Sequence, residues 1–266
     1  ELVNTIEFLV NEGIIQVDKN CKFFGQEFEH LKKYQQEWLC NYSNFDFLKV
    51  WYNQIETNDN EINNFGFRGP EFSAEKPDDT YRIIVVGGST VFGDGVYLED
   101  TISENLKKLL TNNKITNIKN FDVINAGING GISYHEEMLI KNKILDFEPD
   151  MIIVYDGWND AKVGNYNQEK YGQVQNEDLW KNRWIEICNN YNDDFELIIF
   201  VQPILDNKEK EILTDQEYTN FYSRQTIITE GNNLDKYREH VKILNSECSS
   251  AYDLKNTMYN IHEGVY

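Results

Sequence analysis

The sequence predicts an α/β protein in which a central parallel five-stranded sheet lies between layers of helices. From residue 82 onward, short β-branched runs alternate with longer segments of helical periodicity. Three of these runs end on glycine, serine or amide residues, which is typical of strands at the ligand-binding edge of an open sheet. The chain has 266 residues, 40% of them hydrophobic, so it can bury a sizeable core. Such alternation implies parallel strands joined by right-handed crossovers.

The expected elements follow one another along the chain in a regular order. Strands are expected at 82–86, 121–124, 151–155, 197–201 and 249–253. Helices are expected near 100–111, near 134–145, through about 190 and near 235–247. Residues 1–60 have helical periodicity of their own, so we predict a helical N-terminal extension and lead-in segment at 1–80 and an α/β domain at 81–266. In the lead-in segment, we expect Arg68 to make a structural salt bridge.

Ser89 stands at the most informative point of the sequence. It follows the apolar run Ile83 to Val86 and two glycines that permit a tight turn, so its hydroxyl is expected at the carboxyl edge of the sheet, with a helix beginning soon after. A phosphate-binding P-loop is disfavoured because Asp94 follows Gly93 where a lysine is needed. The glycine spacing does not fit a dinucleotide fingerprint, and Val91 breaks the G-x-S-x-G pattern. Taken alone, the turn is equally compatible with a purely structural role.

Two further segments follow predicted strands in the same way. Asn125 to Ser133 comes after the second strand, and Asp156 to Asp160 comes after the third. With Gly87 to Thr90, these segments resemble the three sequence blocks of the SGNH (GDSL-type) serine hydrolases, and Gly157-Trp158-Asn159-Asp160 matches the G-x-N-D block specifically. The resemblance covers roughly residues 62 to 266. It implies a flavodoxin-like three-layer α/β/α fold and a serine esterase or deacylase that acts on a small acyl ester.

The resemblance also implies a role for each of three residues. Ser89 would be the nucleophile, and the oxyanion hole would consist of the Ser89 and Gly130 backbone N–H groups and the Asn159 side-chain amide. Such fixed donors stabilise the charge that forms on the carbonyl oxygen during attack. Structural interpretations remain open: Gly130 as a turn glycine, Asn159 as a cap of a following helix, and Asp160 as a cap or a loop-bracing acceptor.

The sequence departs from the family pattern in two places. Gly88 stands where the family has the aspartate of its Gly-Asp-Ser signature, and no Asp-x-x-His block occurs to supply the base that serine needs. By the resemblance, that block is expected shortly beyond Tyr266, with His262 as a fallback base. The other histidines have less specific expectations: His135 as a surface or packing residue, and His30 and His240 as solvated side chains.

Composition bounds the possible partners. The net charge of −20 and the sequence pI near 4.6 oppose binding to nucleic acid or to an anionic membrane surface. No apolar run approaches the roughly 20 residues that a membrane helix needs. The four cysteines form no C-x-x-C pair, which favours free buried thiols, or a Cys21–Cys40 bridge if the protein is exported. Neither a metal nor a cofactor is predicted.

Three hypotheses about function follow from these patterns. The first is a serine esterase acting through a Ser89 acyl-enzyme on a small-molecule ester, such as an O-acetylated carbohydrate or a lipid ester. The second is a catalytically inactive binding module that keeps the SGNH-like pocket and lacks the histidine base. The third is a nucleotide-binding α/β domain, which depends only on the glycine turn. The compartment and the oligomeric state are not readable from the sequence.

Overall fold

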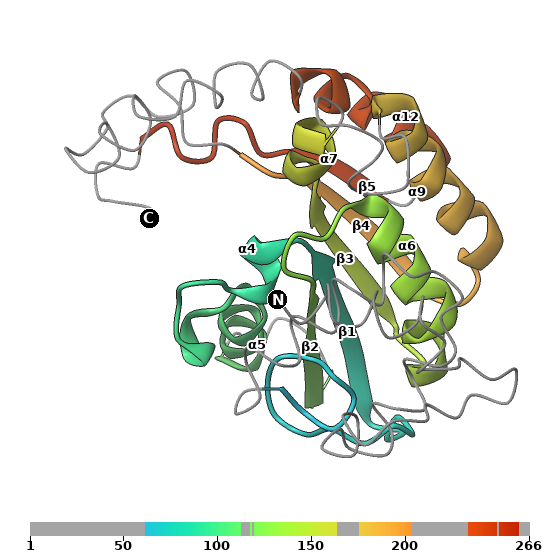
Figure 1. Cartoon of the computed structure of the whole chain (residues 1–266). Helices are drawn as coiled ribbons and strands as arrows, with labels where there is room; N and C mark the ends of the chain where they lie inside the picture. Colours follow the sequence, from blue (N-terminus) through green and yellow to red (C-terminus); the bar gives the residue numbers. More distant parts are fainter. Residues whose placement is uncertain are drawn as a thin grey trace, which may run out of the picture.

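A computed structural model describes residues 62–112, 118, 120–163, 176–203, 234–248 and 250–260. Its centre is a five-stranded parallel sheet with the strand order β2-β1-β3-β4-β5 (Figure 1). The strands are β1 (Thr80–Gly87), β2 (Asn120–Gly127), β3 (Met151–Asp156), β4 (Glu196–Val201) and β5 (Ser250–Asp253). Each begins within two residues of its predicted start, and the predicted fold class is confirmed.

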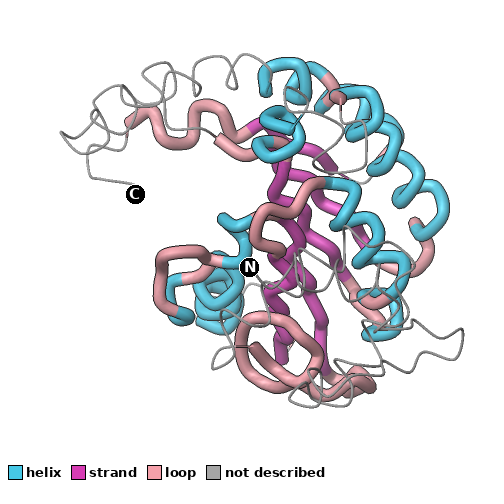
Figure 2. Tube along the Cα trace, in the orientation of Figure 1, coloured by secondary structure: helices cyan, strands magenta, loops and turns pink. Residues whose placement is uncertain are grey.

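Helices cover both faces of the sheet. They are α4 (Ser89–Phe92), η2 (Leu98–Asp100), α5 (Ile102–Asn112), α6 (Ser133–Asn142), η3 (Ile144–Phe147), α7 (Trp158–Val163), α9 (Glu177–Tyr191) and α12 (Val241–Glu247). β2 is added on one side of β1, whereas β3, β4 and β5 are added in turn on the other side. Because crossovers are right-handed, α5 lies on one face, while α6, α9 and α12 lie on the other (Figures 1 and 2).

Alternating side chains of β1 pack into two different cores. Ile84 and Val86 belong to the larger core under α6, α9 and α12, where Trp180 and Trp184 are fully buried. Ile83 and Val85 point into the smaller core under α5. The run is therefore apolar on both faces, as expected of a central strand in a parallel sheet.

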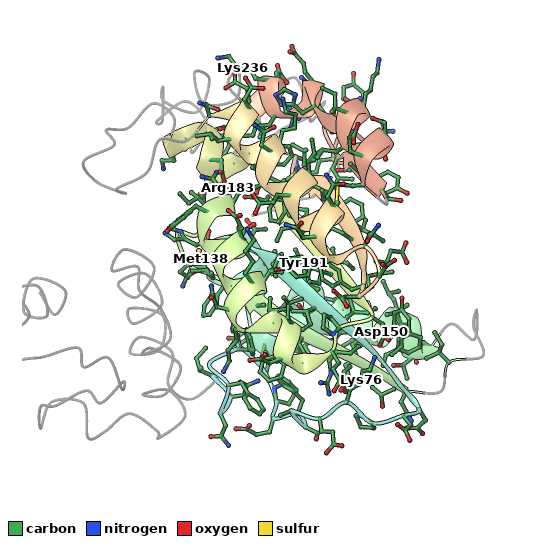
Figure 3. All side chains as sticks on the ribbon, turned by 90° about the vertical axis from the view of Figure 1, so that its right-hand side faces the viewer. Lys76, Met138, Asp150, Arg183, Tyr191 and Lys236 are labelled. Atoms are coloured by element: carbon green, nitrogen blue, oxygen red, sulfur yellow. A yellow bond between two sulfur atoms is a disulfide. The ribbon has the colours of Figure 1, made fainter. Side chains whose placement is uncertain are left out.

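Arg82 organises the amino edge of the sheet. Its side chain is fully buried, and its guanidinium donates to the Ser73, Ala74 and Phe147 carbonyls and to Asp122 Oδ2. Residues 62–79 thus pack against the α/β domain, where four aromatic rings also meet: Phe65, Phe67, Phe72 and Phe147. At the same edge, Lys76 Nζ lies 2.6 Å from Asp150 Oδ1 (Figure 3). The division at residue 80 stays a prediction, and the predicted helical extension at 1–60 lies outside the described residues.

The expectation of free thiols is wrong for two of the four cysteines. Cys188 on α9 forms a disulfide with Cys248, which directly follows α12 and precedes β5. The two residues are 60 positions apart, so no local sequence pattern marks the pair. Cys21 and Cys40 lie outside the described residues. Among the helices that the structure describes, none combines the length and apolar character needed to span a bilayer.

Candidate active site

Ser89 begins the short helix α4 immediately after the turn that ends β1. Its side chain is only partly buried, and Gly88 precedes it in an extended conformation. Its carbonyl accepts hydrogen bonds from the Gly93 and Asp94 N–H groups, which closes the helical turn. Within the described part of the chain, neither the Ser89 hydroxyl nor its N–H has a hydrogen-bond partner. The described part of the fold therefore uses neither group for its own hydrogen bonding.

Gly130 lies in the tight turn that follows β2. The Gly131 N–H donates to the Ile128 carbonyl over 2.8 Å, and Gly130 adopts a φ of +71° in the left-handed region. A Cβ at this position would meet no atom within 4 Å, so the backbone here borders open space. The turn interpretation of Gly130 is correct, and it is compatible with a donor role because its N–H has no partner among the described residues.

Asn159 lies in α7 (Trp158–Val163), shortly after β3, and contacts both other segments. Its Nδ2 donates to the Gly131 carbonyl over 2.7 Å, which leaves its second amide hydrogen for another acceptor. A Cβ built on Gly88 would lie only 2.6 Å from the same Nδ2. The segments that carry Ser89, Gly130 and Asn159 are thus brought together at the carboxyl edge of the sheet. Asn159 does not cap a following helix, because it lies inside α7, which begins at Trp158.

Several contacts fix these segments relative to one another. The Ile128 N–H donates to the Gly87 carbonyl over 2.8 Å and so joins the turn after β2 to the end of β1. Arg68 donates to the Phe92, Gly93 and Val96 carbonyls, and its guanidinium carbon lies 5.1 Å from the centroid of the Phe92 ring. Arg68 therefore has a structural role, exerted through backbone carbonyls at the end of α4.

Three buried carboxyl groups lie behind the site: Glu136, Asp156 and Asp160, each fully shielded from solvent. Asp160 accepts hydrogen bonds from the Ser133 N–H (2.9 Å) and the Ser133 hydroxyl (2.5 Å), as its predicted loop-bracing role requires. Asp156 accepts from Trp180 Nε1 over 2.9 Å. Burial raises the pKa of all three groups, and the proximity of Asp160 raises that of Asp156 further.

Each of the two described histidines, His135 and His240, contacts a group other than Ser89. His135 is fully buried, its Nδ1 accepts from the Ile132 N–H, and burial lowers its pKa to about 4, so it is a packing residue. His240 lies 3.7 Å from Asp178 Oδ1 with its side chain only 15% exposed, so the expectation of a solvated side chain is wrong. His30 and His262 lie outside the described residues. The described part of the chain contains no cluster of three or more histidine, cysteine or acidic side chains that could hold a metal ion.

The strand order and the position of the polar loops define a class of protein. In flavodoxin-like α/β proteins with the order 2-1-3-4-5, ligands bind where the direction of strand addition reverses, between β1 and β3. Ser89 and Asn159 follow these two strands. The protein is therefore a flavodoxin-like three-layer α/β/α protein with a candidate site at its topological switch point, and this fold agrees with the resemblance to SGNH hydrolases.

Solved structures of two esterase variants share this fold. One is an Axe2 variant described as an acetyl-xylooligosaccharide esterase from a Geobacillus species, with a TM-score of 0.50 and 15% identity over 70% of this chain and 81% of that chain. Another is a catalytic variant of Axe2, an acetylxylan esterase from Geobacillus stearothermophilus, with a TM-score of 0.50 and 14% identity over the same shares. At these identities the likeness concerns the fold. No protein-family model and no curated protein matches the sequence.

Ser133 and Glu136 are the residues near the site whose positions the sequence analysis did not anticipate. Ser133 ends the glycine-rich segment after β2, and its partner Asp160 is 27 residues away. Glu136 stands in a helix beside other charged residues, and nothing in its neighbourhood distinguishes a buried glutamate from a solvated one. The positions of Ser133 and Glu136 become apparent only from the way in which α6 packs against α7 and α9.

Proposed function

We propose that this protein is a serine hydrolase of the SGNH type that removes a small acyl group from an ester. One observation supports the proposal: Asn159 Nδ2 donates to the Gly131 carbonyl and lies close to Gly88, so the segments that carry Ser89, Gly130 and Asn159 meet in one small region. In the proposed arrangement a serine hydroxyl lies near several N–H donors, which suits attack on a carbonyl, because the negative charge of the tetrahedral species needs donors at about 3 Å.

The proposed reaction has two halves. In the first, Ser89 Oγ attacks the ester carbonyl carbon and gives its proton to a base, while the carbonyl oxygen becomes an oxyanion bound by the Ser89 and Gly130 N–H groups and the Asn159 amide. The intermediate then expels the alcohol, which takes up the proton from the base, and an acyl-enzyme remains. In the second half, water attacks the acyl-enzyme in the same way and releases the carboxylic acid and the free serine.

The base in this proposal is a histidine outside the described residues. By the resemblance the base is the histidine of an Asp-x-x-His block, and within this sequence His262 is the fallback. His135 is unsuited to the role because it is buried and bonded to the Ile132 N–H.

The proposed substrate is a neutral O-acetylated carbohydrate. Two considerations support this choice: the two solved structures compared above are named as an acetyl-xylooligosaccharide esterase and an acetylxylan esterase, and a chain with a net charge of −20 repels anionic esters. A small acyl group is favoured over a long one because acetyl esters are what those proteins are named for.

A fluorophosphonate probe tests the proposal directly, because it forms a stable adduct only with an activated serine hydroxyl. We expect the full-length protein to form one adduct at Ser89, identified by peptide mass, and to hydrolyse 4-nitrophenyl acetate. Ser89→Ala should abolish both signals. Ser246→Ala, which removes an exposed hydroxyl bonded to the Ile243 carbonyl, is the control and should change neither. Absence of an adduct in the folded wild-type protein would refute the esterase.

The binding-module hypothesis is favoured by one observation: each of the two described histidines contacts a group other than Ser89. This hypothesis predicts no adduct and no hydrolysis, together with saturable binding of an acetylated xylooligosaccharide by calorimetry. Asn159→Ala should weaken that binding. An adduct at Ser89 would exclude the module.

A further inference from the structure

We propose that Asp160 is a positioning residue that sets the distance between two oxyanion donors, Gly130 and Asn159. The inference rests on the proposed function. In this proposal the buried Asp160 carboxylate holds the turn after β2 in place against helix α7.

The contacts form a clamp with two points of attachment. Adjacent residues of α7 bind alternate residues of the segment after β2: Asn159 Nδ2 donates to the Gly131 carbonyl, and Asp160 accepts from Ser133. Gly130 directly precedes the first attachment point. Gly130 belongs to the segment after β2 and Asn159 belongs to α7. Movement of α7 relative to this segment would therefore change the distance between the Gly130 N–H and the Asn159 amide.

Asp160 is suited to this task by its two bonds to one residue. One carboxylate oxygen accepts from the Ser133 N–H over 2.9 Å and the other from the Ser133 hydroxyl, so the carboxylate grips both the backbone and the side chain. The Ser133 N–H is one of the unpaired donors at the start of α6, and Ile132, which precedes it, has no side-chain oxygen to accept that bond. The bond from Asp160 thus also fixes where α6 begins.

Burial makes the clamp rigid and selective for a carboxylate. Asp160 and Ser133 are both fully buried, so water cannot replace the lost acceptor. Arg183 Nη1 donates to the Ser133 hydroxyl oxygen over 3.1 Å, which leaves the hydroxyl hydrogen directed to Asp160. An asparagine at 160 would keep the shape but place an amide donor against one of the two Ser133 donors.

The first experiment measures steady-state hydrolysis of 4-nitrophenyl acetate by the full-length protein. We expect Asp160→Asn to lower kcat by about 100-fold with little change in KM, because displaced donors weaken binding of the transition state more than that of the substrate. Ser133→Ala removes only the hydroxyl bond and should lower kcat less. Asp146→Asn, which changes an exposed aspartate in η3, is the matched control and should leave kcat unchanged.

A double-mutant cycle separates positioning from general destabilisation. If Asp160 acts through the donors, Asp160→Asn should lower kcat much less in an Asn159→Ala background than in the wild type. The proposal would be overturned if the loss of kcat in the double variant equalled the product of the losses in Asp160→Asn and Asn159→Ala. An unchanged kcat in Asp160→Asn would overturn it as well. Should Asp160→Asn fail to fold, Ser133→Ala replaces it in the same cycle, with the same two outcomes.

Amide hydrogen exchange tests the clamp independently of activity. Exchange in the peptide that contains residues 128–133 should accelerate in Asp160→Asn and Ser133→Ala and stay unchanged in Asp146→Asn. If the protein shows no esterase activity but exchange still accelerates in both clamp variants, the clamp is supported as a structural feature of the loop and the esterase proposal alone is refuted. Unchanged exchange in both clamp variants would refute the clamp even in an active enzyme.

Discussion

The two edges of the same sheet use their hydrogen-bond donors in opposite ways. At the amino edge, the buried Arg82 guanidinium donates to three carbonyls and a carboxylate. At the carboxyl edge, the Ser89 and Gly130 N–H groups have no partner among the described residues. Satisfied donors stabilise the fold, whereas uncommitted donors are what a ligand needs. The comparison indicates that the Arg82 donors at the amino edge stabilise the fold, and that the proposed function resides at the carboxyl edge.

Replacement of Arg82 gives the strongest test of the amino edge. Arg82→Met would remove a fully buried guanidinium that donates to Asp122 and to three carbonyls, of which the Phe147 carbonyl is buried, so we expect a loss of about 3–5 kcal/mol in the free energy of unfolding. The kcat of the molecules that remain folded should not change. Urea denaturation measures the first quantity. Lys76→Met, which breaks a partly exposed ion pair at the same edge, should cost no more than about 1 kcal/mol.

The reverse result is expected at Asn159. Asn159→Ala removes a proposed oxyanion donor, so kcat should fall by about 100- to 1000-fold, equivalent to about 3–4 kcal/mol of barrier. The melting temperature should fall much less than in Arg82→Met, because only the bond to Gly131 is lost. Asn142→Ala removes an exposed asparagine that bonds to the Met138 carbonyl, and it should leave kcat unchanged. Equal losses of kcat in Asn159→Ala and Asn142→Ala would contradict the proposed donor role of Asn159.

The buried carboxyls between the edges predict a dependence of stability on pH. Burial and the nearby Asp156 and Asp160 carboxyls raise the pKa of Glu136, so the folded protein keeps a proton that the unfolded chain loses. Stability contributed by this group is therefore present below the ordinary glutamate pKa and is lost as the pH rises through the folded-state value. Glu136→Gln should reduce the slope of unfolding free energy against pH by up to about 1.4 kcal/mol per unit.

Urea denaturation at several pH values measures that slope. Glu186→Gln, at an exposed position that pairs with Lys141, should leave the slope nearly as in the wild type. If Glu136→Gln and the wild type show the same slope throughout, the buried glutamate does not retain its proton.

The smallest expected effect uses a pair of glycines with the same backbone conformation. Gly130 and Gly95 have φ values of +71° and +82°, and a Cβ on either meets nothing within 4 Å. Alanine at either position should cost about 1–2 kcal/mol of unfolding free energy from backbone strain. Only Gly130→Ala should also lower kcat, because alanine keeps the N–H but the strain at this φ would turn that proposed donor away from the oxyanion. A similar fall in kcat for Gly95→Ala would show that strain alone reduces activity.

The sequence predicted the sheet well because each strand carries its own signal. Runs such as Ile83 to Val86 are β-branched and end on glycine, and the polar residues that follow each strand marked the candidate site. The bond between Ser133 and Asp160 joins residues of two helices and depends on how those helices pack. Burial of Glu136 and of most of the His240 side chain likewise depends on neighbouring elements, and for His240 the charged local composition predicted a solvated side chain instead.

The disulfide between Cys188 and Cys248 has a consequence for the exposed edge of the sheet. β5 is an edge strand of only four residues, and an exposed strand edge can pair with another chain. Cys248 lies two residues before this strand and is covalently joined to α9, so the start of β5 cannot drift from its place beside β4 while the bond is intact. Chemical reduction should therefore make the edge available for strand exchange and aggregation before the core itself opens.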